Sequence, residues 1–228
     1  KINLISILQK FWKRYKMIKF LDLYKQDKFL HKIILKKISN LFKKGDFILG
    51  SEVELFEKKF SKFCGAKYAI SCANGTDALT IALKSLNLPH NSEVIIPAMT
   101  YCSTAFSVIN ANLKPILADV EKLGSTICIK DLKKKINHKT KVILPVHLYG
   151  SVAKLNEIKE IIKSKKIYLI DDCAQAHGAY DDSNIGVTHK VKIGAATDLS
   201  CFSLYPGKNL GAYGDAGIIT TNNLNLYK

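Results

Sequence analysis

The sequence predicts an α/β fold in which helices cover both faces of a mainly parallel β-sheet. After residue 63, short apolar segments alternate with stretches in which apolar residues recur at helical spacing. This alternation is typical of strand–helix–strand units, which place a parallel sheet between two helix layers. Hydrophobic residues make up 47% of the 228 residues, so the chain can bury a sizeable core and disorder is not expected.

Two helices are expected before the first strand. Apolar residues recur at helical spacing over residues 28–43, and Gly45 ends that pattern. Ser51 is expected to be the N-cap of a second helix that extends to about Phe63. The reason is that Glu54 follows Ser51 three residues later, as in a capping box.

Seven apolar segments are expected to form the strands of the sheet. The last of them follows a glycine-rich turn too closely for a crossover helix, so it is expected to run antiparallel. The expected strands are 68–72, 93–96, 115–118, 142–146, 167–171, 198–203 and 216–220. The helices between them are expected at 76–86, 102–111, 130–136 and 154–164.

The net charge of +16 does not indicate a nucleic-acid-binding protein. Arg14 is the only arginine, whereas proteins that read nucleic acids depend on arginine for bidentate contacts to bases and phosphates. The sequence also lacks a recognition motif that combines aromatic and basic residues. The charge instead favours small anionic ligands, such as a nucleotide diphosphate, through its long-range field.

Cysteine usage and hydropathy predict a reduced, cytoplasmic protein. The six cysteines include no C-x-x-C pair, and neither His147 nor His177 pairs with a cysteine or carboxylate at metal-ligand spacing, so no metal is expected. No apolar stretch is long enough to span a membrane. Residues 1–16 form a basic amphipathic pattern, which fits a membrane-surface helix or, the preferred interpretation, an N-terminal extension.

The most informative segment runs from Ser203 to Gly217 and places one lysine, Lys208, in a glycine-rich turn between two apolar strands. Pro206 and Gly207 precede this lysine and fix how the turn presents it. A lysine that is shielded from water attacks carbonyl groups and forms a Schiff base. Lys208 is therefore a candidate catalytic residue.

Two other segments supply the partners that such a lysine needs. The expected strand at 167–171 ends in two carboxylates, Asp171 and Asp172. Gly75 and Thr76 begin an expected helix, and free N–H groups at a helix start form an anion site. Pyridoxal 5′-phosphate (PLP) requires a Schiff-base lysine, an acid for its pyridinium nitrogen and donors for its phosphate, so PLP is the expected cofactor.

These segments resemble the DegT/DnrJ/EryC1/StrS family of sugar aminotransferases, which are PLP enzymes of fold type I. The resemblance covers roughly residues 17–228, and six motifs in family order carry it: Phe47-Ile48-Leu49-Gly50 with Glu52, Ala73-Asn74-Gly75-Thr76-Asp77-Ala78, Pro97-Ala98-Met99-Thr100-Tyr101, Pro145-Val146-His147-Leu148-Tyr149-Gly150, Asp171-Asp172-Cys173-Ala174-Gln175-Ala176-His177-Gly178, and the segment around Lys208. The resemblance implies a seven-stranded, mostly parallel sheet with one antiparallel strand. It also implies that residues 17–228 form the PLP-binding large domain and that the family's small C-terminal domain is not part of this chain.

The resemblance assigns the chemistry of the site to four residues. Lys208 would form the Schiff base and move the proton between substrate and cofactor. Asp172 would pair with the pyridinium nitrogen; it is preferred over Asp171 because the family's acid directly precedes a Cys/Ala-Ala-Gln segment. Gln175 would contact the 3-oxygen of the cofactor, and Tyr101 would stack on its ring.

The resemblance assigns the phosphate of the cofactor to Gly75, Thr76 and Ser203. Three of the proposed site residues have a structural alternative. Thr76 fits a simple helix cap, Gln175 a buried amide bonded to the backbone, and Tyr101 a core tyrosine.

The function implied by the resemblance is transfer of an amino group to a nucleotide-linked keto sugar, for the biosynthesis of amino sugars and surface polysaccharides. Glutamate is the amino donor in most of the family. The form Pro206-Gly207-Lys208-Asn209-Leu210-Gly211 resembles members that aminate carbon 3 of 6-deoxyhexoses. Type I sites form between two subunits, so a homodimer is expected for the full-length protein.

Three alternatives to this function stay open. The first is a PLP-dependent sugar dehydratase, which Lys208 disfavours because family dehydratases carry histidine at that position. The second is a PLP-binding regulator without catalysis, and the third is an inactive fragment of the aminotransferase.

Overall fold

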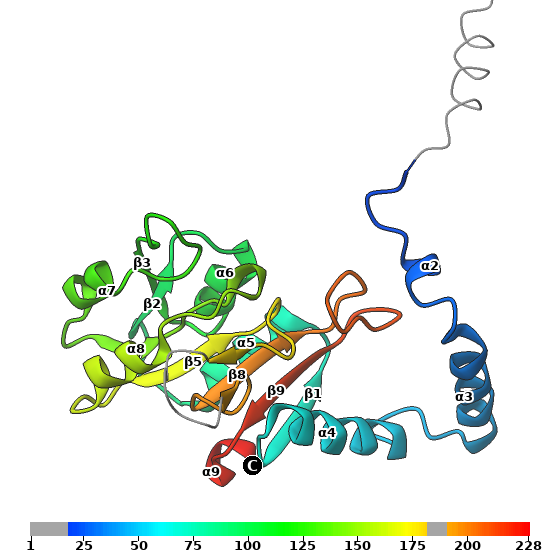
Figure 1. Cartoon of the computed structure of the whole chain (residues 1–228). Coiled ribbons are helices and arrows are strands. Elements are labelled where there is room, and N and C mark those ends of the chain that lie inside the picture. The colour runs from blue at the N-terminus through cyan, green and yellow to red at the C-terminus, as the bar shows by residue number, and fades with distance from the viewer. Residues whose placement is uncertain (1–17, 182–190) are drawn as a thin grey trace, which may run out of the picture. The chain divides into compact units, whose positions relative to one another are not determined.

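The computed structural model describes residues 18–181 and 191–228 (Figure 1). The chain divides between Gly45 and Asp46 into two compact units, and each is described by itself. In the first unit, α2 spans Leu23–Gln26 and α3 spans His31–Lys44. Gly45 ends α3 in the left-handed conformation (φ 68°), as the sequence predicts. The expected extension at residues 1–16 lies outside the described residues.

The second unit is built on a seven-stranded sheet with the strand order β1-β9-β8-β5-β4-β2-β3. Every neighbouring pair is parallel except the two pairs that include β9, which runs antiparallel to β1 and to β8 (Figure 1). The predicted seven-stranded sheet with one reversed strand is confirmed. The strands are β1 (Tyr68–Cys72), β2 (Glu93–Pro97), β3 (Lys114–Ala118), β4 (Thr140–Ile143), β5 (Tyr168–Asp172), β8 (Leu199–Ser203) and β9 (Gly217–Thr221).

Helices cover both faces of this sheet because neighbouring residues of its buried strands point to opposite sides. Val94 and Ile96 of β2 belong to the core cluster that includes residues of α5 and α6, whereas Ile95 belongs to the cluster with α4, α7 and α8. The helices are α4 (Ser51–Cys64), α5 (Gly75–Ser85), α6 (Cys102–Asn110), α7 (Ile129–Lys135), α8 (Leu155–Ile162) and α9 (Leu224–Tyr227). A short 3₁₀ turn, η1 (Leu148–Gly150), and a two-stranded pair, β6 (Tyr180–Asp181) with β7 (Val191–Lys192), complete the unit.

The expected N-cap at Ser51 is wrong by one residue. Gly50 is the N-cap of α4, and Ser51 is the first helical residue. The backbone N–H and the Oγ of Ser51 donate to Oδ2 of Asp46, at 2.8 and 2.9 Å. The acceptor for the helix start therefore comes from an aspartate five residues upstream.

Strand β4 ends at Ile143, three residues earlier than the sequence predicts. Pro145 has no N–H to donate and interrupts the ladder. The chain returns to the sheet at a single bridge between Val146 and Asp172, and the N–H of His147 donates to the carbonyl of Asp172 at 3.0 Å. This irregular end places His147 beside the carboxyl end of β5.

The carboxyl ends of the parallel strands β5 and β8 lie side by side, since Asp172 pairs with Cys201. In open α/β sheets, ligands bind outside this edge. Of the helices in the described ranges, none is both long and apolar enough to cross a membrane.

Candidate active site

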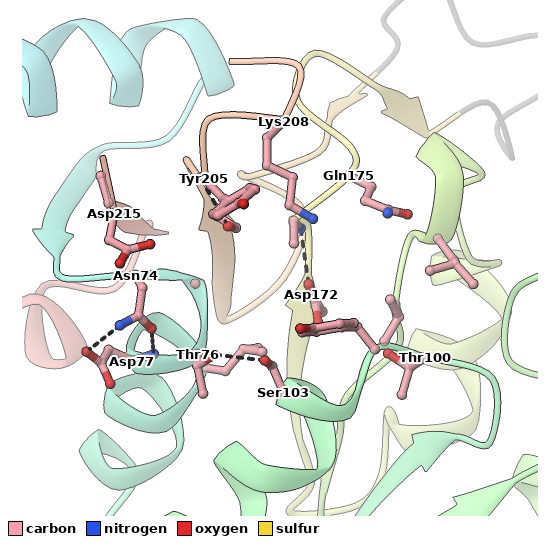
Figure 2. Close-up of a pocket in the computed structure, with 18 residues that line it drawn as sticks. Asn74, Thr76, Asp77, Thr100, Ser103, Asp172, Gln175, Tyr205, Lys208 and Asp215 are labelled. Carbon is pink, nitrogen blue, oxygen red and sulfur yellow. Dashed lines mark hydrogen bonds between the residues drawn. The ribbon is translucent and has the colours of Figure 1, made fainter. Parts of the chain in front are cut away.

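A cavity of about 730 Å³ opens at the carboxyl ends of β5 and β8, next to the first turn of α5 (Figure 2). Its volume is in the range of cavities that bind small molecules and cofactors. It is lined by all seven residues that the sequence predicts for the cofactor: Gly75, Thr76, Tyr101, Asp172, Gln175, Ser203 and Lys208.

Lys208 lies on the turn between β8 and β9, and its side chain extends into the cavity toward Asp172 and Gln175 (Figure 2). Backbone hydrogen bonds hold the turn: the N–H of Lys208 donates to the carbonyl of Tyr205 at 2.8 Å, and that of Ala212 to the carbonyl of Leu204 at 2.8 Å. The lysine is half-buried, so it is partly shielded from water while its amine remains accessible from the cavity.

The two neighbouring aspartates of β5 have different surroundings. Asp171 is fully buried and accepts from Thr197 Oγ1 at 2.6 Å, and its other oxygen lies 3.0 Å from His147 Nε2. Burial alone raises the pKa of Asp171, but hydrogen bonds from His147, Ser200 and Thr197 outweigh it and hold that pKa below its usual value. Asp171 therefore stays ionised inside the protein.

Asp172 points to the other side of the strand and lines the cavity. Burial raises its pKa above the usual value, against the hydrogen bonds from Ala174 N–H (3.1 Å) and Thr104 Oγ1 (2.8 Å) and the positive charge of Lys208. Two neighbouring carboxylates whose pKa values shift in opposite directions commonly have different roles. Of the two aspartates, Asp172 is the one placed to act on a ligand.

The first turn of α5 presents backbone donors at one end of the cavity. Asn74, not Thr76, is the N-cap: its Oδ1 accepts from Asp77 N–H at 2.8 Å, so the capping alternative for Thr76 is wrong. Within the described ranges, the backbone N–H groups of Gly75 and Thr76 have no acceptor. Thr76 Oγ1 donates to Ser103 Oγ at 2.8 Å, which brings a second hydroxyl to the same place (Figure 2).

Gly75 is required because α5 starts in contact with β8. A Cβ atom on Gly75 would lie 2.6 Å from Cβ of Ser203. We expect Gly75→Ala to lower the free energy of unfolding by about 1–3 kcal/mol through overpacking and to weaken phosphate binding. Urea unfolding and phosphate titration measure the two effects. The control is Gly214→Ala, because no atom lies within 4 Å of a Cβ atom there; equal losses in both variants would contradict the prediction.

Gln175 and Tyr101 also line the cavity. Gln175 Oε1 accepts from the backbone N–H of Tyr149 at 2.7 Å, so the backbone bond that the structural alternative invokes is present. The same side chain nevertheless lines the cavity, where its NH₂ group is available. Tyr101 is 73% exposed and lines the cavity, so its alternative as a core tyrosine is wrong.

His177 packs against Phe202 near the lysine turn, with ring centroids 5.3 Å apart. Neither of its buried ring nitrogens has a hydrogen-bond partner in the described part of the chain; the Ser203 backbone is close but outside hydrogen-bond geometry. Burial lowers the pKa of His177 to about 4, and the charge of Lys208 acts in the same direction. His177 is therefore neutral at physiological pH.

The protein is expected to lose stability through His177 as the pH falls from 6.5 toward 4. In this window the unfolded chain binds a proton at the ordinary pKa of 6.5, whereas the folded protein does not until about pH 4. We expect His177→Phe to lose less free energy of unfolding between pH 7 and pH 5 than the unaltered protein. Urea unfolding at both values measures the difference, and equal losses would show that His177 does not carry this dependence.

His147, Asp171 and Cys173 form a buried group whose polar atoms lie within 4.8 Å of one another. Both ring nitrogens of His147 are already bonded, one to Asp171 and one to the N–H of Ala153. Burial also raises the pKa of the Cys173 thiol well above its usual value, so Cys173 is not a thiolate that could bind a metal. The group is explained by its own hydrogen bonds, and the absence of a metal stays a prediction.

Sequence reasoning missed four residues of the cavity and its support. Ser103 and Thr104 follow Tyr101 on α6, Tyr205 precedes Lys208 on the turn, and Asn74 caps α5. The run of hydroxyl residues after β2 was a usable signal for the first two. Their partners lie far away in the sequence, so only the fold identifies what they bind.

A buried acid, a lysine and backbone donors at a helix start line one cavity, and these are the groups that a PLP site requires. Residues 29–228 match the model of the DegT/DnrJ/EryC1/StrS aminotransferase family, and the chain belongs to this family of PLP-dependent transaminases. The predicted family and the predicted cofactor are confirmed. The residues fit PLP, because the unpaired N–H groups of Gly75 and Thr76 suit its phosphate and Asp172 suits its pyridinium nitrogen.

Three relatives illustrate the similarity. The chain is 39% identical over 210 residues to the dTDP-3-amino-3,6-dideoxy-alpha-D-galactopyranose transaminase of Aneurinibacillus thermoaerophilus, covering 92% of this chain and 56% of that protein. Two solved structures match: S. venezuelae DesV in complex with a ketimine intermediate (TM-score 0.86, 32% identity, 92% and 54% covered), and ntda from Bacillus subtilis with bound cofactor PMP (TM-score 0.83, 31% identity, 94% and 47% covered). The chain spans about half the length of the curated relatives it matches.

Proposed function

We propose that this protein is a PLP-dependent aminotransferase that transfers an amino group to a nucleotide-linked keto sugar in amino-sugar biosynthesis. The observation that carries the proposal is that Lys208, Asp172 and the anion site at Gly75 and Thr76 line a single cavity. Among the described residues that line this cavity, Lys208 is the only lysine and Asp172 is the only buried carboxylate.

Each residue has a distinct task in this proposal. The cofactor, when bound, supplies an electron sink for the carbon that loses its proton. Lys208 holds the cofactor and moves a proton at its Nζ. Asp172 holds a proton on the pyridinium nitrogen, Gln175 donates from its NH₂ group, and the first turn of α5 binds the phosphate.

The proposed substrate is a 3-keto-6-deoxyhexose linked to a nucleotide, with glutamate as the amino donor. The relative from Aneurinibacillus thermoaerophilus supports the sugar, because its name specifies a 3-amino-3,6-dideoxy sugar. Matched 3-keto and 4-keto nucleotide sugars, each assayed with glutamate, test it by the rate of amino-sugar formation. Faster turnover of the 4-keto compound would overturn the proposal that carbon 3 of the sugar is aminated. Formation of no amino sugar at all would favour the dehydratase or regulator alternatives.

We also propose that the protein acts as a homodimer in the cytoplasm. Tyr101 and Tyr205 line the cavity and are 73% and 58% exposed, so the cavity is open where a second subunit would cover it. All six cysteines are free, which suits a reducing compartment. Light scattering of the full-length protein is expected to give twice the mass of one of its chains, and the mass of a single chain would count against the dimer.

Borohydride reduction after incubation with PLP tests the site directly. We expect peptide mapping to find the pyridoxyl group on Lys208, because Lys208 is the lysine that lines the cavity. The internal control is Lys192, which donates to the carbonyl of Phe63 at 2.9 Å outside the cavity. Labelling of Lys192 to the same extent as Lys208 would mean that the cavity does not select its lysine.

A further inference from the structure

His147 is fully buried beyond the end of β4 and does not line the cavity, yet it contacts β5, whose Asp172 does. Its backbone N–H donates to the carbonyl of Asp172 at 3.0 Å. Its Nε2 lies 3.0 Å from Oδ2 of Asp171, and its Nδ1 accepts from the N–H of Ala153 at 3.0 Å. One side chain thus joins the end of β5 to the segment that follows β4.

These contacts determine the tautomer of the ring. A backbone N–H can only donate, so the Nδ1 that faces Ala153 carries no proton. The proton of a neutral ring is then on Nε2, where it donates to the ionised carboxylate of Asp171. Both ring nitrogens are used in this arrangement, and the carboxylate of Asp171 receives a donor on each oxygen.

The segment that His147 closes contains an unusual turn. The N–H of Gly150 donates to the carbonyl of His147 at 3.1 Å, and the ring binds Ala153 three residues further on. Inside the turn from His147 to Gly150, Tyr149 has φ 58°, a left-handed conformation that costs energy in a residue with a side chain. Surrounding contacts must therefore hold Tyr149 in place, and the bonds of His147 at both ends of the segment supply them.

The strained turn orients one backbone donor toward Gln175. It directs the backbone N–H of Tyr149 at Oε1 of Gln175, at 2.7 Å, although the Tyr149 side chain is 74% exposed. With its oxygen turned to Tyr149, Gln175 presents its NH₂ group to the cavity (Figure 2). A ligand at this point must therefore offer an acceptor, as an anionic oxygen does.

We propose that His147 is a positioning residue of the active site, which in its Nε2–H tautomer closes the 147–153 segment on Asp171 and so fixes the amide of Gln175 as a donor. The first test uses the unaltered protein without cofactor, labelled with ¹⁵N in histidine and glutamine. We expect the His147 ring to carry its proton on Nε2, with Nδ1 unprotonated. A proton on Nδ1 would overturn the proposal even if every variant failed to fold.

Two variants of matched length separate positioning from a merely structural role. His147→Gln keeps one acceptor and one donor, whereas His147→Met keeps neither. Gln175 is one of only three glutamines in the chain, so its side-chain amide signals can be followed directly. We expect these signals to be kept in His147→Gln and to shift and broaden in His147→Met. Unchanged Gln175 signals in a folded His147→Met protein would overturn the proposal.

The second readout is the dissociation constant of PLP, and only this part rests on the proposed function. His147→Met is expected to raise it about tenfold, the scale of one hydrogen bond to a charged group, and His147→Gln by less than about twofold. In a Gln175→Ala background, His147→Met should add no further loss, because both changes remove the same contact. Additive losses would overturn the proposal. Failure of the unaltered protein to bind PLP would overturn the proposed function instead, while the NMR results would still decide the role of His147.

Discussion

Replacing Lys208 with alanine is expected to lower the rate of amino transfer by about 10³-fold or more. Proton transfer by a positioned side chain alone contributes roughly 10²–10⁴ to the rate. The variant would also lack the amine that forms the Schiff base. The cavity and its anion site remain in the variant, so PLP should still bind without covalent attachment. Single-turnover kinetics with a keto sugar and absorbance titration with PLP measure the two quantities.

The matched control for Lys208→Ala is Lys166→Ala. Lys166 is exposed and lies outside the cavity, so the same loss of charge there is expected to change the rate by less than about twofold. Turnover by Lys208→Ala within tenfold of the unaltered protein would show that another group moves the proton.

The second large effect is expected for Asp172→Asn, with a loss of about 10³-fold in the rate of amino transfer. Asparagine has nearly the same shape but cannot hold a negative charge against the pyridinium nitrogen. Its NH₂ group would also face one of two donors, Thr104 Oγ1 or Ala174 N–H, that now point at carboxylate oxygens. Steady-state kinetics at saturating substrate, with PLP affinity measured in parallel, gives the loss.

Asp198→Asn is the control for Asp172→Asn. Asp198 Oδ2 accepts from the N–H of Leu169 at 2.8 Å near the amino end of the same strand, away from the cavity, and an amide oxygen can replace that acceptor. We expect its rate to stay within about twofold of the unaltered protein. Equal losses in both variants would mean that damage to β5, rather than the charge at Asp172, explains the result.

The sequence was sufficient for the sheet because strand and helix periodicity are local properties. The β1 strand has the predicted bounds, and the other strands differ at their ends by one to three residues. The largest error, at the end of β4, comes from Pro145, whose missing N–H interrupts the ladder inside an otherwise apolar run. The cap of α4 was misplaced because the aspartate that accepts from Ser51 lies outside the usual capping spacing.

The site could be predicted only where its residues belong to short motifs. Lys208, Asp172 and Gly75 each stand at or just beyond the end of a strand in a recognisable pattern, and all three line the cavity. Thr104 was marked only by its place in a run of hydroxyl residues, and its partner could not be predicted, because only the fold shows that Asp172 of β5 lies 2.8 Å from its hydroxyl. The hydrogen bond from Tyr149 N–H to Gln175 could not be predicted either, since every residue except proline has a backbone N–H.

The position of β9 in the sheet has a consequence for the order of events during synthesis. This strand lies between β1 and β8, and Tyr68 of β1 pairs with Thr221 of β9, so in the described sheet β1 is joined to the other strands through β9. The hairpin that carries Lys208 is local, but its pairing with β1 closes a loop of most of the domain and is slow by comparison. The sheet that carries both the lysine turn and the phosphate-binding turn is therefore complete only after residue 221 has left the ribosome.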